Sequence, residues 1–417
     1  MSQPASRLVA ALDLGTTRVL AAIGDVTGDS RNPGVRVLGV GSERSTGIRR
    51  GVVRDIEETT RAIGRALKDA QLMAGVEVGT LYCGIAGEHV AGRLSHGVVS
   101  ITGNEIRTAD VARVNEVAAN VSFSRDHELL HAVPQDYLVD QQAGISEPIG
   151  MTGSRLEAQV YLVTVLSSAL ANMQKCIERA GFRVGEFVLE PLASSLAVLS
   201  PDERELGAAL IELGGGSTNV SVFQNGKICH TASLMFAGNH VTNDLVHGLQ
   251  VPQQDAERLK ETRGAAYEHL VGEGEMIELP SGPGQPPRPA ARRVLAHIMH
   301  MRLQEIFELA LDELTRTGLR QRLAAGVVLS GGGAEAPGIV ELAREVLALP
   351  VRVGSPSVGL SGLVDRVAMP RMTVPTGLLL YGAKQTLQTG GFGASGRRSP
   401  AVDKVIGPVK RWLQDFF

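Results

Sequence analysis

Aromatic residues are scarce in this sequence, at 4% of 417 residues, so aliphatic side chains must form most of any buried core. Long apolar runs are also missing, because no stretch approaches the ~20 apolar residues that a membrane-spanning helix needs. The first residues, MSQPASR, lead into a strand and not into the apolar segment of a signal peptide. These absences predict that any contact with a membrane is peripheral.

Cysteines are few and the net charge is small. Cys83, Cys176 and Cys229 lie far apart and form no Cys-x-x-Cys pair, which favours a reducing compartment and thiols that serve as core residues. The formal net charge is −3 and no broad basic face is visible, so we expect no nucleic acid partner. With 43% hydrophobic and 20% charged residues, the chain has the composition of a globular protein large enough for two or more domains.

Three short apolar strands are each followed by a glycine-rich turn. The strands are expected at residues 8–14, 208–213 and 327–329, and the turns are Gly15-Thr16-Thr17, Gly214-Gly215-Gly216-Ser217-Thr218 and Gly331-Gly332-Gly333. In the first two cases an acid, Asp13 or Glu212, precedes the turn and a second strand follows it. This repeated pattern predicts two related lobes, and chance similarity between two hairpins is the alternative.

The chemistry of these turns suits a polyphosphate. Glycine lets backbone N–H groups approach phosphate oxygens closely, because no side chain blocks them and left-handed backbone is allowed. The hydroxyl groups of Thr16, Thr17, Ser217 and Thr218 add donors, and Asp13 and Glu212 add carboxylates that can hold Mg²⁺ through its waters. One such turn would be weak evidence, since glycine ends many strands. Three in this arrangement predict that a polyphosphate and Mg²⁺ bind where the turns meet.

The same residues resemble the actin superfamily of actins, sugar kinases and heat-shock chaperones. Residues 11–18 and 211–219 resemble its two phosphate loops, and residues 329–338 (LSGGGAEAPG) resemble its adenosine loop. Residues 189–197 (LEPLASSLA) and 374–383 (VPTGLLLYGA) resemble the two helices that connect its lobes. The resemblance implies an α/β, two-lobed actin-like fold, which is a duplicated ribonuclease H-like fold.

The resemblance also implies roles for individual residues. Glu190 would lie near the attacking water, and Glu257 and Lys260 would lie against the ribose and adenine. Without the family, these last two would be a solvated pair on a helix. Arg18, Gly238 and Asn239 complete the expected nucleotide-binding set.

Within the superfamily, the sequence most resembles the FtsA family of bacterial division proteins. The similar segments are residues 95–106 (SHGVVSITGNEI), 108–114, 236–244 (FAGNHVTND) and the Pro/Gly-rich 278–289. We predict that the chain divides into two lobes. The core of the first lobe is expected at residues 7–83 and 161–200, with an inserted small α+β subdomain at 84–160, and the second lobe at 201–369, with an outer subdomain at about 236–310. A helix returning to the first lobe (370–387), a flexible linker (388–404) and an amphipathic membrane-targeting helix (405–417) are expected to follow.

Two residues depart from the superfamily pattern. Glu212 and Asn219 stand where the second phosphate loop usually carries aspartates. Glutamate is one methylene longer, and asparagine removes a negative charge near the metal, so a metal-organising group would be displaced. Backbone contacts to phosphate would remain. We therefore expect ATP binding with slow or absent hydrolysis.

The last residues predict a membrane-binding helix. The bulky apolar residues share one helical face, and the basic residues Lys410 and Arg411 can lie near anionic lipid headgroups. That apolar face consists of Val409, Trp412, Leu413, Phe416 and Phe417. The alternative is a terminal helix docked on the globular body, which the Gly/Ser-rich stretch at residues 388–399 disfavours.

The resemblance implies a scaffold that polymerises with itself on the cytoplasmic side of the inner membrane. It would bind the FtsZ C-terminal tail, anchor FtsZ filaments at the mid-cell ring and recruit later division proteins. Arg302 lies on the long helix where that family receives the FtsZ tail, although an intramolecular salt bridge is an alternative role. Other candidates are a soluble sugar-kinase-type phosphotransferase, a chaperone and an actin-like component of type IV pilus machinery.

Overall fold

The structure, a computed structural model, describes residues 7–280 and 286–389. No helix within this part of the chain is long and apolar enough to cross a membrane. The predicted membrane helix, with Val409, Lys410, Arg411, Trp412, Leu413, Phe416 and Phe417, and nearly all of the predicted linker lie outside the described residues. Those expectations stay predictions.

The first lobe is built on a six-stranded sheet with the order β11-β6-β1-β2-β3-β19. β1, β2 and β3 are antiparallel neighbours, and β6 and β11 extend the sheet in parallel with β1. The strands are β1 (Leu8–Leu14), β2 (Arg18–Gly28), β3 (Pro33–Arg44), β6 (Thr80–Ile85), β11 (Arg183–Leu189) and β19 (Leu360–Gly362). β1 is apolar along almost its whole length and buried, as expected of a central strand covered on both faces.

One face of this sheet is covered by α1 (Ile56–Ala74), beside α3 (Ser167–Arg179). Asp55 caps the start of α1, because its Oδ1 accepts the Glu58 N–H at 2.9 Å, and Gly75 caps the end in the left-handed conformation. A Cβ at Gly41 of β3 would lie 1.8 Å from the Ala66 carbonyl oxygen, so only glycine lets the helix pack this closely.

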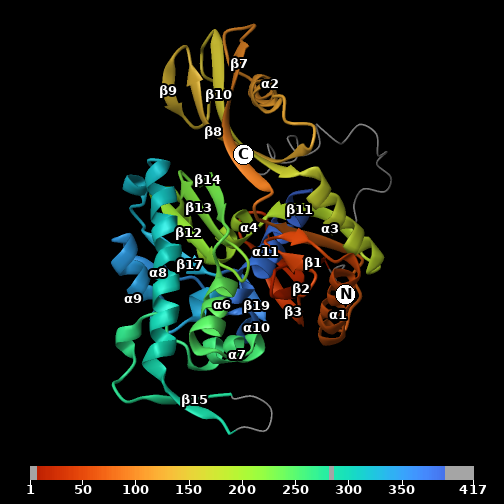
Figure 1. The fold of residues 1–417 in the computed structure, drawn as a ribbon. Coiled ribbons are helices and arrows are strands. Elements are labelled where there is room, and N and C mark those ends of the chain that lie inside the picture. Colours follow the sequence, from red (N-terminus) through yellow and green to blue (C-terminus); the bar gives the residue numbers. More distant parts are fainter. Residues whose placement is uncertain (1–6, 281–285, 390–417) are drawn as a thin grey trace.

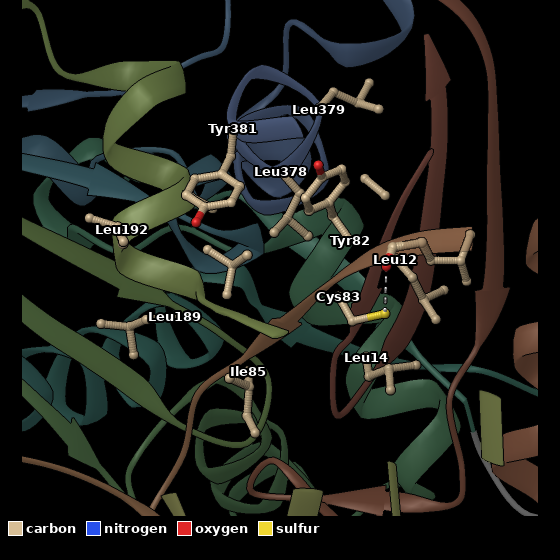
Figure 2. Packing of buried hydrophobic residues seen from close by; sticks show 14 of the residues in the cluster. Leu12, Leu14, Tyr82, Cys83, Ile85, Leu189, Leu192, Leu378, Leu379 and Tyr381 are labelled. Carbon is tan, nitrogen blue, oxygen red and sulfur yellow. Dashed lines mark hydrogen bonds between the residues drawn. The ribbon is translucent and has the colours of Figure 1, made fainter. Parts of the chain in front are cut away.

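The other face is covered by α4 (Glu190–Val198) and α11 (Thr373–Thr389), which cross each other (Figure 1). Figure 2 shows Leu378 and Tyr381 of α11 over the strand residues Leu12, Tyr82 and Cys83. The Tyr82 and Tyr381 rings meet edge to face, with centroids 5.9 Å apart. α11 also packs against α4, whose first residue is Glu190.

The second lobe repeats the strand pattern of the first, with the order β14-β13-β12-β17-β18. Again three antiparallel strands are followed by two parallel ones. The strands are β12 (Ala208–Leu213), β13 (Thr218–Gln224), β14 (Lys227–Leu234), β17 (Val327–Ser330) and β18 (Val351–Val353). The two related lobes inferred from the repeated hairpin are confirmed.

The helices of the second lobe are α5 (Pro201–Leu206), α6 (Gly238–Leu249), α7 (Gln253–Arg263), α8 (Arg292–Arg316) and α9 (Ile339–Leu347). β15 (Met276–Leu279) and β16 (Arg288–Ala291) pair as antiparallel strands, and the sequence between them has the Pro and Gly content that is typical of a loop. Arg288 and Pro289 belong to that second strand and not to the loop.

A small α+β unit is inserted between β6 and α3. Its sheet has the order β7-β10-β8-β9, and α2 packs on one face. Its elements are β7 (Val90–Ser100), α2 (Thr108–Ala119), β8 (His127–Val139), β9 (Gln142–Ile145) and β10 (Arg155–Leu166).

This inserted unit also touches the second lobe. Lys227 Nζ of β14 donates to the Gln135 carbonyl oxygen at 2.9 Å, and Gln135 Nε2 donates to the Ile228 carbonyl oxygen at 3.0 Å. The Thr231 N–H donates to the Tyr161 hydroxyl at 2.9 Å. The insertion therefore grows out of one lobe and is hydrogen-bonded to the other.

The chain crosses back to the first lobe earlier than the sequence suggests. Residues 201–369 are predicted to form the second lobe, yet β19 within them pairs in parallel with β3. α10 (Val364–Val367) follows, and Val367 packs with Leu20 and Val37 of the first lobe. The second lobe's chain thus supplies the edge strand of the first sheet.

Candidate functional site

The first two glycine-rich turns touch each other across the two lobes. The turn at Gly15 joins β1 to β2, and the turn at Gly214 joins β12 to β13. A Cβ at Gly215 would lie 2.3 Å from Thr17 Cγ2, and one at Gly216 would lie 2.4 Å from Thr16 Oγ1. Any side chain at these glycines would collide with the opposite turn, so the site needs glycine there.

The third turn lies against the second. Cβ atoms at Gly331 and Gly333 would lie 2.6 Å from the carbonyl oxygen and 2.7 Å from the Cβ of Leu213, and Gly331 has a φ of 80°. Gly332, by contrast, is exposed and has open space around it. Ser330, at the end of β17, buries an Oγ without a hydrogen-bond partner among the described residues. The three turns therefore form one continuous glycine-lined cradle that contains an unsatisfied hydroxyl.

The start of α6 is fastened to the second turn. The Gly238 N–H donates to the Gly214 carbonyl oxygen at 3.0 Å, and the Asn239 N–H donates to the Gly215 carbonyl oxygen at 2.8 Å. Gly238 and Asn239, both expected near nucleotide, thus lie at the site, but their N–H groups already have acceptors within the chain.

Lys260 and Glu257 of α7 form a part-buried network and not a solvated pair. Lys260 Nζ donates to Glu257 Oε2 at 2.7 Å, to Thr242 Oγ1 at 2.8 Å and to the Gly238 carbonyl oxygen at 3.2 Å. Only 17% of the Lys260 side chain and 33% of the Glu257 side chain are exposed. The network holds α7 against α6 beside the second turn.

Three carboxyl groups gather beneath the turns. Asp13 and Glu212 each lie one residue before the end of their strands, β1 and β12. Glu190 begins α4, where Gly84 leaves room for it because a Cβ there would lie 2.9 Å from Glu190 Cγ. Burial raises the pKa of Asp13 to about 7, with the Glu212 charge adding to the rise. Burial, followed by the charges of Asp13 and Glu212, raises the pKa of Glu190 well above its usual value.

Such a cluster is suited to a divalent cation, which would neutralise the repulsion and lower these pKa values. Within the described residues, no three His, Cys, Asp or Glu side chains converge closely enough to hold a metal ion directly. Asp13 and Glu212 could hold a cation such as Mg²⁺ through the waters that it keeps.

Glu212 and Asn219, the two residues that depart from the superfamily pattern, belong to one hydrogen-bond network. Ser194 Oγ of α4 donates to Glu212 Oε1, and Asn219 Nδ2 lies 3.5 Å from Glu212 Oε2. Asn219 Oδ1 in turn accepts from Ser233 Oγ at 2.8 Å. Burial raises the pKa of Glu212 to about 7, although the hydrogen bonds from Ser194 and Asn219 lower it. The Glu212 carboxylate is thus held by a connecting helix and a neighbouring strand.

Sequence reasoning missed Ser194, although a signal existed. Ser194 lies four residues after Glu190, so both side chains share a face of α4 directed at the acidic cluster. Ser233 and the unpartnered Ser330 gave no such signal, because their positions depend on pairing between distant strands.

Thr218 and Arg302 make contacts within the chain. The Thr218 hydroxyl, predicted as a donor in the cradle, is fully buried and donates to the Phe236 carbonyl oxygen at 2.8 Å. The Arg302 guanidinium donates to both Asp244 oxygens, at 2.5 and 3.1 Å, and also to Glu305. A role for Arg302 toward a partner stays a prediction.

Known proteins resemble this chain along its whole length. The family model "Cell division protein FtsA" matches residues 209–377, and "SHS2 domain inserted in FTSA" matches residues 87–164. Cell division protein FtsA of Pseudomonas aeruginosa is 40% identical over 420 residues, covering 100% of both chains. The chain belongs to the FtsA family. FtsA of Neisseria meningitidis serogroup B is 41% identical over 99% of each chain, and that of Escherichia coli K12 is 35% identical over 99% of this chain and 98% of its own.

Solved structures agree on the fold. The PilM-PilN type IV pilus biogenesis complex contains a chain with a TM-score of 0.63 at 15% identity, covering 90% of this chain and 98% of that one. MreB5 of Spiroplasma citri bound to ADP has a TM-score of 0.53 at 16% identity, covering 93% and 100%. The actin-like fold is therefore confirmed, and the protein is a cell division protein with that fold and the inserted domain of the FtsA family.

Proposed function

We propose that the protein is an ATP-binding scaffold that polymerises on the cytoplasmic face of the inner membrane and anchors FtsZ filaments at the division ring. The observation that carries the nucleotide part is the contact between Gly215 of one lobe and Thr17 of the other, above the acidic cluster. Family membership supports the division role. A sugar-kinase-type activity has no comparable support.

The cradle fits a nucleoside triphosphate. The backbone of the first two turns would hold phosphates, with the hydroxyls of Thr16, Thr17 and Ser217 and the side chain of Arg18 nearby. Gly331, Gly332 and Gly333 would lie near adenosine, and Glu257 and Lys260 near its ribose and base. Because the opposing turns touch, phosphates can enter between them only if the lobes part slightly. Nucleotide binding and the interlobe arrangement are therefore coupled in this proposal.

Slow hydrolysis is part of the same proposal. Mg²⁺, held through its waters by Asp13 and Glu212, would offset the developing charge on the transferred phosphoryl group. Glu190 would orient the attacking water; burial and its acidic neighbours raise its pKa and favour the protonated form, and a bound cation would favour the carboxylate that accepts a proton. Ser194 Oγ donates a hydrogen bond to Glu212 Oε1, and this competing contact argues against efficient placement of the metal by Glu212.

The scaffold role is tested with an FtsZ C-terminal tail peptide and with liposomes. Immobilised peptide should retain the full chain, and the chain should sediment with anionic liposomes. Deletion of residues 409–417 should abolish sedimentation and leave peptide binding intact. Equal sedimentation of the truncated chain would refute the membrane anchor, and failure of the full chain to bind the peptide would refute the FtsZ role.

A further inference from the structure

A short hairpin stands beside the first glycine-rich turn. It consists of β4 (Ile48–Arg49) and β5 (Val52–Val53), with Arg50 and Gly51 at its tip. The Ser45 N–H, just before the hairpin, donates to the Thr17 carbonyl oxygen at 2.9 Å. The base of this hairpin is thus fastened to the turn that would hold phosphate.

The tip has a defined conformation. Arg50 has a φ of 52° and Gly51 a φ of 76°, so both lie in the left-handed region that two-residue hairpin turns use. Glycine and asparagine adopt this region readily, whereas arginine there is uncommon. A Cβ at Gly51 would lie 2.2 Å from the Ala86 carbonyl oxygen, so the tip rests on the loop after β6. Arg50 thus occupies a backbone conformation that favours glycine or asparagine.

A buried histidine lies directly under the tip. His89 is 6% exposed, and neither ring nitrogen has a hydrogen-bond partner among the described residues. Its Cε1 lies 3.2 Å from the Cβ position of Gly51, and the Cβ position of Gly87 is 2.7 Å from the Arg50 carbonyl oxygen. Unsatisfied buried nitrogens are costly, so this contact is unusual for a purely structural residue.

The Arg50 side chain is exposed, and it makes no ion pair or hydrogen bond with any residue of ranges 7–280 and 286–389. Burial, followed by the charges of Arg302 and Arg50, lowers the pKa of His240 on α6. His240 Nδ1 accepts the Ala237 N–H at 3.2 Å, and the next residue, Gly238, is bonded to the second turn.

Two more cations lie along the same edge. Arg18 and Arg44 are direct cross-strand partners on β2 and β3, and both are exposed without an ion pair in the described structure. Like charges directly opposite each other are destabilising in a sheet unless an anion offsets them. Arg18, Arg44 and Arg50 are thus three exposed cations close to the first turn in the chain, while Thr46 between the last two donates a hydrogen bond to Glu58.

We propose that Arg50 binds the terminal phosphate of a nucleoside triphosphate held between the glycine-rich turns, while His89 positions the hairpin tip that carries Arg50. A guanidinium can donate two parallel hydrogen bonds to phosphate oxygens. Arg50 would then distinguish a triphosphate from a diphosphate and link the first lobe to α6 of the second. This inference rests on the proposed binding of ATP between the turns.

The test compares MgATP and MgADP affinities, measured by displacement of a fluorescent nucleotide from the full chain. Arg50→Asn suits the left-handed backbone, so the fold is retained while the guanidinium is lost. Its affinity for ATP should fall by about tenfold or more, with little change for ADP. The control is Arg54→Ala, an exposed arginine just beyond the hairpin, which should change neither affinity.

The positioning role of His89 is tested with His89→Phe, which keeps a ring in place and removes both nitrogens. It should lower the ATP-to-ADP affinity ratio while the melting temperature stays the same or rises. A ratio unchanged from wild type in both variants overturns this inference and leaves ATP binding intact. Failure of the wild-type chain to bind either nucleotide overturns the proposed function itself.

Discussion

At the scale of single residues, the acidic cluster makes the stability of the protein depend on pH. Folding raises the pKa of Asp13 and of Glu212 from 3.8 and 4.5 to about 7. The folded chain therefore holds these protons more tightly than the unfolded chain, and the stability so gained is present below about pH 4 and is lost as pH rises through about 7. Each unit of pKa shift corresponds to about 1.4 kcal/mol.

Without nucleotide, the melting temperature should thus be lower at pH 8 than at pH 6, and Asp13→Asn should flatten this dependence. Differential scanning calorimetry at low salt measures both. Excess Mg²⁺ should reduce the effect, because a cation stabilises the ionised forms. An equal pH dependence in wild type and Asp13→Asn would contradict the assignment.

The glycines of the cradle offer a second residue-scale prediction. Gly215→Ala places a methyl group against Thr17, so the turns must separate or distort. ATP affinity should fall by about tenfold or more, equivalent to about 1.4 kcal/mol, in a titration calorimetry experiment. Gly332→Ala is the matched control, because nothing lies within 4 Å of its Cβ position. Equal affinities in the two variants would show that the contact between the turns does not shape the site.

Residue types and spacing were enough to predict the three turns and the two acids before them. They could not predict how these side chains are used. Thr218 turns away from the cradle because its hydroxyl meets the Phe236 carbonyl oxygen, and Glu212 is bonded to Ser194. Both contacts join segments whose distance in space depends on strand pairing, which a linear pattern does not contain.

At the scale of elements, apolar periodicity located the long helices and central strands well. The apolar residues Ile56, Ile63 and Leu67 recur at the spacing of a helix, and α1 spans Ile56–Ala74. The short elements were missed. β19 has three residues and pairs with a strand more than 300 positions earlier, and the β15–β16 pair lies in a stretch whose Pro and Gly content suggests a loop. Such strands form only when a partner is already in place.

At the scale of the whole molecule, the insertion ties the two lobes together at β14. Tyr161→Phe removes the acceptor of the buried Thr231 N–H and should destabilise the protein by about 1–3 kcal/mol. Hydrogen exchange at the β14 amides should rise with it. The control is Tyr137→Phe, whose hydroxyl accepts from Asn115 inside the insertion and does not touch the second lobe.

In Tyr137→Phe, hydrogen exchange at the β14 amides should be unchanged, even if exchange within the insertion itself increases. Equal exchange in the two tyrosine variants would mean that the insertion does not restrain the second lobe. The contrast matters for function, because any lobe motion on nucleotide binding would be transmitted to the insertion through Lys227, Gln135 and Tyr161.

The late return of the chain to the first sheet also affects how the protein folds during translation. β19 and α11, which complete that sheet and cover its face, are translated after nearly every other described residue. The amino-terminal half emerging from a ribosome therefore exposes an unpaired β3 edge and an uncovered apolar face until synthesis is almost finished. A nascent chain paused before residue 360 should be a favoured substrate for holding chaperones. The chaperone should release the chain once α11 has been translated.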